Sequence, residues 1–187
     1  MKYFILSLLF LGLVSSCRNK TASTIDKSSP NKETAKKVLS PHESIMAMVG
    51  DAHVHIDYSS PGVRGRTIFG KLIPFGKLWR AGANSATSIE INKNLIINGE
   101  LLLAGKYGVF IIPNQEKWTI IFNTRWDVHG TDKYLEKEDV LRVDVLPNVL
   151  EDTHEHLKYG VERIDDSNGL ISIAWDKIGV NIPFQVE

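Results

Sequence analysis

Apolar and polar side chains alternate along much of the chain with a period of two. Residues 51–58 alternate throughout, and residues 87–91 alternate similarly. Because successive side chains of a strand point to opposite faces, this period indicates strands with one buried face. Further short apolar runs bounded by turn residues predict strands at residues 95–97, 100–102, 107–112, 118–122, 140–146, 156–163, 169–175 and 180–186.

Turn residues separate these runs. Asn98-Gly99 between two apolar runs is the strongest short signal for a hairpin, and residues 165–169 predict a second hairpin turn. Residues 134–139 are compatible with one helical turn, and no long helix is predicted. Pro183 predicts that the last strand lies at a sheet edge, because proline cannot donate a hydrogen bond to the ladder. The pattern as a whole predicts an all-β fold, an antiparallel β-sandwich of about nine strands.

The first residues have the features of an export signal. Lys2 precedes an apolar run at residues 3–13, which is too short to span a bilayer, and small residues follow at 14–16. Leu13-Val14-Ser15-Ser16-Cys17 resembles the lipobox of bacterial lipoproteins. The alternative is an ordinary secretory signal with an incidental cysteine, but Cys17 is the only cysteine and has no internal disulfide partner. We predict a signal peptide at residues 1–16 and lipid attachment at Cys17.

The chain after Cys17 divides into a polar segment and a domain. Residues 17–37 have almost nothing to bury and predict a disordered tether, whereas residues 38–187 predict a single domain. The absence of aspartate just after Cys17 favours the outer membrane, with the domain facing the periplasm. The whole chain has 22 basic and 22 acidic residues, so no basic field exists to bind nucleic acid.

Residues 58–88 fit neither an ordinary strand nor a flexible linker. Five glycines and two prolines lie between Pro61 and Gly82, together with many apolar residues. This composition predicts one long ordered loop, the kind of segment that carries binding residues on a rigid scaffold. The loop also contains planar and charged side chains, which are Arg64, Arg66, Trp79, Arg80 and Asn84.

This loop and several later positions resemble a bacterial family catalogued as domain of unknown function 2911. The resemblance covers about residue 40 to the C-terminus. The matching residues are Ser60-Pro61, Gly65-Arg66, Ile68-Phe69-Gly70, Leu72, Pro74-Phe75-Gly76, Trp79-Arg80, Gly82-Ala83-Asn84, Ala86-Thr87, Gly99, Leu102, Ala104-Gly105, Tyr107, Pro113, Trp118, Ile121-Phe122-Asn123, Arg142, Trp175 and Ile182-Pro183-Phe184. The resemblance implies a signal-bearing or lipidated protein of Bacteroidetes-type bacteria, and it implies no established activity.

Four loop residues are candidate ligand-binding residues. Trp79 offers an apolar face for stacking, Arg66 and Arg80 offer planar donors for a carboxylate or phosphate, and Asn84 adds a neutral donor and acceptor. The alternative is that these residues only hold the loop to the sandwich. In that case Trp79 belongs to the core, and the arginines bind loop carbonyls or pair with acids such as Glu90 or Asp127.

Histidines provide a second candidate chemistry. His53 and His55 share one strand face beside Asp51 and Asp57, so they are weak candidates for zinc ligands. The simpler interpretation is the polar face of an amphipathic strand, and the resemblance does not mark these histidines. No G-x-S-x-G, H-E-x-x-H or nucleotide-binding glycine motif occurs, so we expect no cofactor.

Three functions remain open. The one we favour is a monomeric, lipid-anchored, non-catalytic module that binds a carbohydrate, cell-wall fragment or protein through residues 61–88. The second is an envelope glycan hydrolase, whose carboxylates or histidines would come from distant strands. The third is a structural lipoprotein whose loop only completes the fold.

Overall fold

The computed structural model describes residues 38–187. The expected signal peptide (1–16), the expected tether (17–37) and the lipid site Cys17 lie outside the described residues and stay predictions. In the described part, no helix is long and apolar enough to cross a membrane.

The described residues form ten strands and one short 3-10 turn, η1 (Glu136–Glu138). The strands are β1 (His42–Val49), β2 (Ala52–Ser59), β3 (Thr87–Ile91), β4 (Leu95–Ile97), β5 (Glu100–Leu102), β6 (Gly105–Ile112), β7 (Trp118–Asn123), β8 (Asp139–Val145), β9 (Pro147–Arg163) and β10 (Asn168–Val186).

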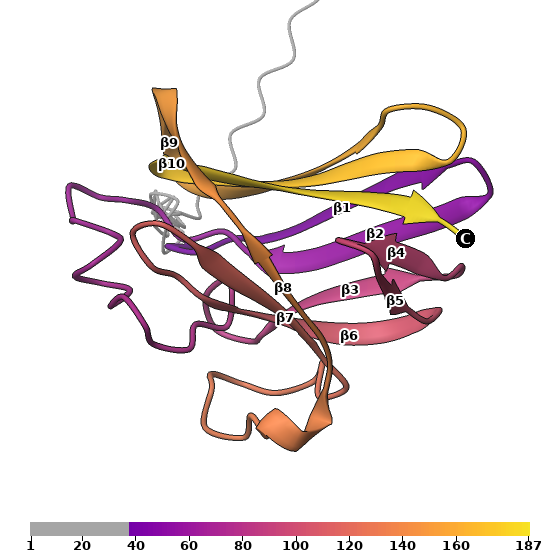
Figure 1. Ribbon diagram of the computed structural model, residues 1–187. Helices are drawn as coiled ribbons and strands as arrows, with labels where there is room; N and C mark the ends of the chain where they lie inside the picture. Colours follow the sequence, from indigo (N-terminus) through magenta and orange to yellow (C-terminus); the bar gives the residue numbers. More distant parts are fainter. Residues whose placement is uncertain (1–37) are drawn as a thin grey trace, which may run out of the picture. The chain divides into compact units, whose positions relative to one another are not determined.

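Two antiparallel sheets make up the fold. The larger has the order β1-β2-β3-β6-β7-β8, and the smaller has the order β5-β4-β10-β9. They lie as two layers (Figure 1), and the main core fills the space between them. The predicted all-β, antiparallel sandwich is confirmed. The alternating burial of β2 shows why, since its apolar residues face the core while His53, His55 and Asp57 are partly exposed.

The two predicted hairpin turns are confirmed, at Asn98-Gly99 and between β9 and β10. Asn98 and Gly99 have φ values of 53° and 83° and connect β4 to β5. This pair of positive φ angles is what a type I′ turn requires. The predicted helical turn at 134–139 is reduced to η1.

Strand β10 differs from the prediction. The two expected strands at 169–175 and 180–186 are one strand, interrupted by irregular register around Asp176, whose φ is 55°. Pro183 does not mark an edge, because β10 lies between β4 and β9. Its pairing with β9 ends at Val180 and its pairing with β4 begins at Phe184, so proline occupies the gap between the two ladders.

The outer face of the larger sheet is half covered. Residues 124–135 pack across β6 and β7, forming a second small core whose buried members are Ala86, Phe110, Ile121 and Val128. Gly108 permits this close approach, because a Cβ there would lie 2.5 Å from the Arg125 carbonyl oxygen. The outward-facing residues of β1 and β2 stay exposed or partly exposed, and a step results between the covered and uncovered halves.

The long loop between β2 and β3 is fixed by backbone hydrogen bonds at both ends. Near its start, the Val63 amide donates to the Glu155 carbonyl on β9 over 2.6 Å. Near its end, Trp79 and Ile111 exchange two hydrogen bonds of 2.8 Å, so the loop continues beside β6. The loop extends from one end of the sandwich, on the left of Figure 1. It has the defined path that its composition predicts.

Candidate functional site

Trp79 belongs to an aromatic cluster in the core. Its ring stacks on Trp175 with centroids 5.8 Å apart, and Phe69 meets both rings edge-on at 6.1 Å. Trp118 completes the cluster, 4.7 Å from Phe69. The Trp79 side chain is 4% exposed, and its indole nitrogen donates to the Gly82 carbonyl over 3.0 Å. It therefore has no free face on which a ligand could stack.

A cavity of about 240 Å³ lies above this cluster, and we call it the arginine pocket. Three arginines of the long loop line it, and its lining contains no aspartate or glutamate. The full lining is Ser40, Pro61, Arg64, Arg66, Leu72, Ile73, Trp79, Arg80, Gly82, Ala83 and Trp175. The fold thus brings Arg66, Trp79 and Arg80 together, whereas Asn84 does not line the pocket.

The arginines of the described chain fall into two groups. Three form ion pairs with carboxylates, which are Arg125 with Glu138, Arg142 with Glu136 and Asp139, and Arg163 with Asp166. The other three are Arg64, Arg66 and Arg80, and none has a carboxylate oxygen within 4.0 Å among residues 38–187. All three line the arginine pocket. Glu90 pairs with Lys106 instead of a loop arginine.

Arg66 and Arg80 differ in their hydrogen bonding. Arg66 donates to the carbonyls of Val63 (3.0 Å) and Gly62 (2.5 Å), so it holds the turn of the loop. Arg80 Nε is buried and has no hydrogen-bond partner in the described part of the chain. Burial lowers the pKa of Arg80 from its ordinary value, but a guanidinium stays charged at neutral pH.

A second buried donor in the same pocket is also unsatisfied. The indole nitrogen of Trp175 has no partner among the described residues. Unpaired buried donors are rare and cost free energy, so each one requires an explanation.

Asn84 is exposed and shapes the backbone. Its φ is 59°, and its carbonyl accepts from the Gly130 amide over 3.1 Å. Its side-chain amide reaches only Ser59 Oγ, at 3.5 Å. Asn84 thus lies between the arginine pocket, which Ala83 lines, and a second concavity, which Ser85 lines.

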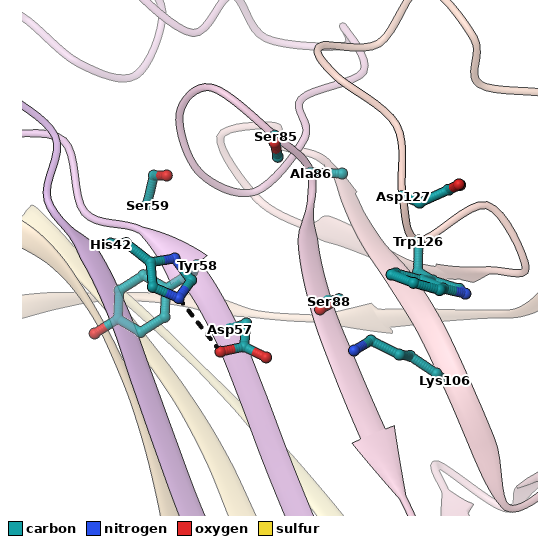
Figure 2. A pocket seen from close by; sticks show the side chains of 10 residues that line it. All are labelled: His42, Asp57, Tyr58, Ser59, Ser85, Ala86, Ser88, Lys106, Trp126 and Asp127. Atoms are coloured by element: carbon teal, nitrogen blue, oxygen red, sulfur yellow. Dashed lines mark ion pairs between the residues drawn. The ribbon is translucent and has the colours of Figure 1, made fainter.

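The second concavity is a groove of about 370 Å³ at the step on the outer face of the larger sheet, and we call it the outer-face groove. Figure 2 shows His42 and Asp57 on one side, Lys106 and Trp126 on the other, and Ser88 between them. Trp126 is 43% exposed, and Lys106 Nζ lies 4.5 Å from its ring centroid. The remaining lining residues are Tyr58, Ser59, Ser85, Ala86 and Asp127.

The histidines near this groove have neither metal-site nor triad geometry. Asp57 Oδ1 lies 3.5 Å from His42 Nε2 and 3.6 Å from His55 Nε2, while Ser44 Oγ contacts the same His55 Nε2 at 2.7 Å. A serine–histidine–aspartate relay needs the acid and the serine on opposite ring nitrogens, so these contacts do not form one. Within residues 38–187, no group of three or more His, Asp or Glu side chains could hold a metal ion. His53 and His55 therefore lie on the polar face of β2.

The sequence analysis did not identify Trp126 and Trp175 as candidate site residues. The Trp126-Asp127 pair in a short polar segment was a usable signal for an exposed aromatic residue. No local signal identifies Trp175, because its unsatisfied nitrogen depends on the loop packed against it.

The fold and the site define a class of protein, an antiparallel β-sandwich with a cationic pocket on a long ordered loop. The chain belongs to the family described as Protein of unknown function (DUF2911), which matches residues 40–184. No curated protein and no solved structure matches the chain significantly.

Proposed function

We propose that the protein is a lipid-anchored envelope module, not an enzyme, that binds an anionic group in the arginine pocket. One observation carries the proposal: Arg64, Arg66 and Arg80 line one pocket that contains no carboxylate, and none of them forms an ion pair among residues 38–187. Guanidinium groups and an indole N–H are all donors. The matching ligand therefore carries several acceptor oxygens and negative charge, as a carboxylate or a phosphate does.

The roles of the pocket residues differ from those expected if a ligand stacked on Trp79. Trp79 forms part of the pocket floor, and Arg66 binds loop carbonyls as well as facing the pocket. Arg80 is the principal ligand-binding residue, because it lines the pocket and, unlike Arg66, its guanidinium has no hydrogen bond or ion pair to a loop carbonyl or carboxylate in the described chain. Anchoring through Cys17, after cleavage of residues 1–16, would hold this pocket near the periplasmic side of the outer membrane.

The test is thermal unfolding of the purified full chain with phosphate, pyrophosphate, acetate or citrate. An anion present at a hundred times its dissociation constant should stabilise the folded state by about 2.7 kcal/mol. We expect at least one of these anions to raise the unfolding midpoint of the parent. The midpoint of Arg80→Gln should not rise.

Arg163→Gln is the matched control, since it removes one exposed positive charge elsewhere. It should respond to the anions as the parent does. Without anions, Arg80→Gln should unfold at the same temperature as the parent or higher, because the variant removes a partly buried charge that has no counter-ion. If no anion raises the midpoint, or if Arg80→Gln still responds, the arginine pocket is not an anion site.

A further inference from the structure

The outer-face groove is a second concave surface, and it shares no lining residue with the arginine pocket. We propose that this groove binds a neutral saccharide, with Trp126 as the aromatic surface against which a sugar ring stacks. This inference is independent of anion binding in the arginine pocket.

The exposure of Trp126 is the first support. Trp79, Trp118 and Trp175 are at most 4% exposed, whereas Trp126 is 43% exposed at the rim of the groove. Covering an exposed aromatic ring with a ligand removes apolar surface from water, which favours binding. A tryptophan at such a site offers a flat apolar face beside a polar N–H, which suits the C–H faces and hydroxyls of a sugar.

Trp126 is not needed to hold its own segment in place. Val128 is buried in the second small core, and the Arg125 guanidinium binds the Glu138 carboxylate at 2.7 Å. Tyr134 donates a 2.6 Å hydrogen bond to Asp139. These contacts fix both sides of Trp126, so the path of the segment does not depend on its ring, which itself contacts Lys106 Nζ at 4.5 Å.

The chemistry of the lining is the second support. Both hydrogen-bond donors and acceptors face the groove, and they are His42, Asp57, Ser59, Ser85, Ser88, Lys106 and Asp127. Two carboxylates lie with one ammonium group and one imidazole, so both signs of charge are present with a small acidic excess, which disfavours an anionic ligand. The arginine pocket differs, because three guanidinium groups line it without a carboxylate. A ligand with many hydroxyls and no net charge fits the outer-face groove best.

The groove is also preorganised. His42, Asp57, Ser88 and Lys106 come from four neighbouring strands, β1, β2, β3 and β6. The segment that carries Trp126 is tied to the end of the long loop by the 2.9 Å bond from the Ala86 amide to the Val128 carbonyl. Rigid walls lower the entropy cost of binding, and about 370 Å³ lies within the size range of small-molecule sites.

The test uses the full chain with ¹⁵N-labelled tryptophan. Its four indole N–H signals are followed by NMR during titration with cellotriose, chitotriose, maltotriose or mannotriose. Titration to about 10 mM detects dissociation constants in the millimolar range. The Trp126 signal is identified by its loss in the Trp126→Phe variant. At least one trisaccharide should shift this signal more than it shifts the signals of the three buried indoles. Trp126→Ala should weaken binding by about tenfold, and Trp126→Phe should weaken it less.

Phe75→Ala is the matched control, because Phe75 is a 38% exposed aromatic residue that lines neither the groove nor the arginine pocket. It should bind the trisaccharide as the parent does. Arg80→Gln should also keep saccharide binding, and Trp126→Ala should keep the response to anions, so the two sites can fail separately. The proposal is overturned if none of the four trisaccharides binds, or if a folded Trp126→Ala variant binds as tightly as the parent.

Discussion

Two tryptophans of the same chain have opposite environments. Trp79 is enclosed by Phe69 and Trp175 in the core, and Trp126 lies at the rim of the outer-face groove. The difference decides what each side chain contributes. Burying an aromatic ring stabilises the fold, whereas an exposed ring contributes mainly when a ligand covers it.

This contrast gives a prediction for stability. Trp79→Ala should lower the free energy of unfolding by about 3–5 kcal/mol, because it leaves a cavity within the aromatic cluster. Trp126→Ala should change it by less than about 0.5 kcal/mol, as is usual for surface substitutions. Urea unfolding of both variants measures the difference. A Trp79→Ala variant as stable as the parent would contradict the assignment of Trp79 to the core.

The sequence identifies the arginines as candidates but does not distinguish their roles. Arg66, Arg80 and Arg142 look alike in the chain, and what separates them is the presence of an acceptor within reach. Arg142 meets Glu136 and Asp139, Arg66 meets loop carbonyls, and Arg80 Nε meets no acceptor within the described residues. Such differences arise from tertiary packing, so they could be found only in the structure.

At the scale of elements, the long loop is attached to the sandwich through Tyr159 of β9. Its buried hydroxyl donates a 2.8 Å hydrogen bond to the Ala81 carbonyl, beside Arg80. Burial raises the pKa of Tyr159 above its ordinary value of 10.0. The folded state therefore holds this proton more tightly than the unfolded state does.

The sign of the resulting pH dependence follows from linkage. The contribution of the Tyr159 proton to folding stability is complete below pH 10.0. It is lost as the pH rises toward the raised pKa of Tyr159 in the folded state. In this range, ionisation of Tyr159 in the unfolded state should lower the free energy of unfolding by about 1.4 kcal/mol per pH unit. Urea unfolding between about pH 9 and about pH 11 should show a smaller slope for Tyr159→Phe than for the parent.

The same variant should lose little stability at neutral pH. The Ala81 carbonyl still accepts from Thr87 Oγ1 over 2.9 Å, so no buried acceptor is left unpaired. Equal alkaline slopes in Tyr159→Phe and the parent would show that Tyr159 does not control the alkaline loss.

Most strands could be predicted from local pattern, and the exceptions have a physical reason. β2 alternates because one face is buried, and the Asn98-Gly99 turn is specified by its own residues. β1 and the first half of β9 were missed, because exposed residues dominate them and mask the period. The union of two predicted strands in β10 depends on pairing with both β9 and β4, which local sequence does not encode.

At the scale of the whole molecule, the end of the long loop separates two kinds of surface. Arg80 and Ala83 line a pocket of one charge sign, and Ser85 and Ser88 line a groove of mixed polarity. Neither surface is built on a metal cluster or a catalytic relay within residues 38–187.

The proposed anchor of the protein is lipid on Cys17, which is a prediction from the sequence. A single acyl chain gives only marginal membrane binding, so a lipoprotein needs the multiple chains that the lipobox implies.

In bacteria supplied with alkyne-tagged palmitate, the parent chain should carry the label and fractionate with the outer membrane. Cys17→Ser should carry no label and leave that fraction. Because Cys17 lies outside the matched residues 40–184, the purified variant should unfold at the parent's temperature and bind the same anions. A labelled Cys17→Ser chain, or an unlabelled parent, would contradict lipid attachment at this cysteine.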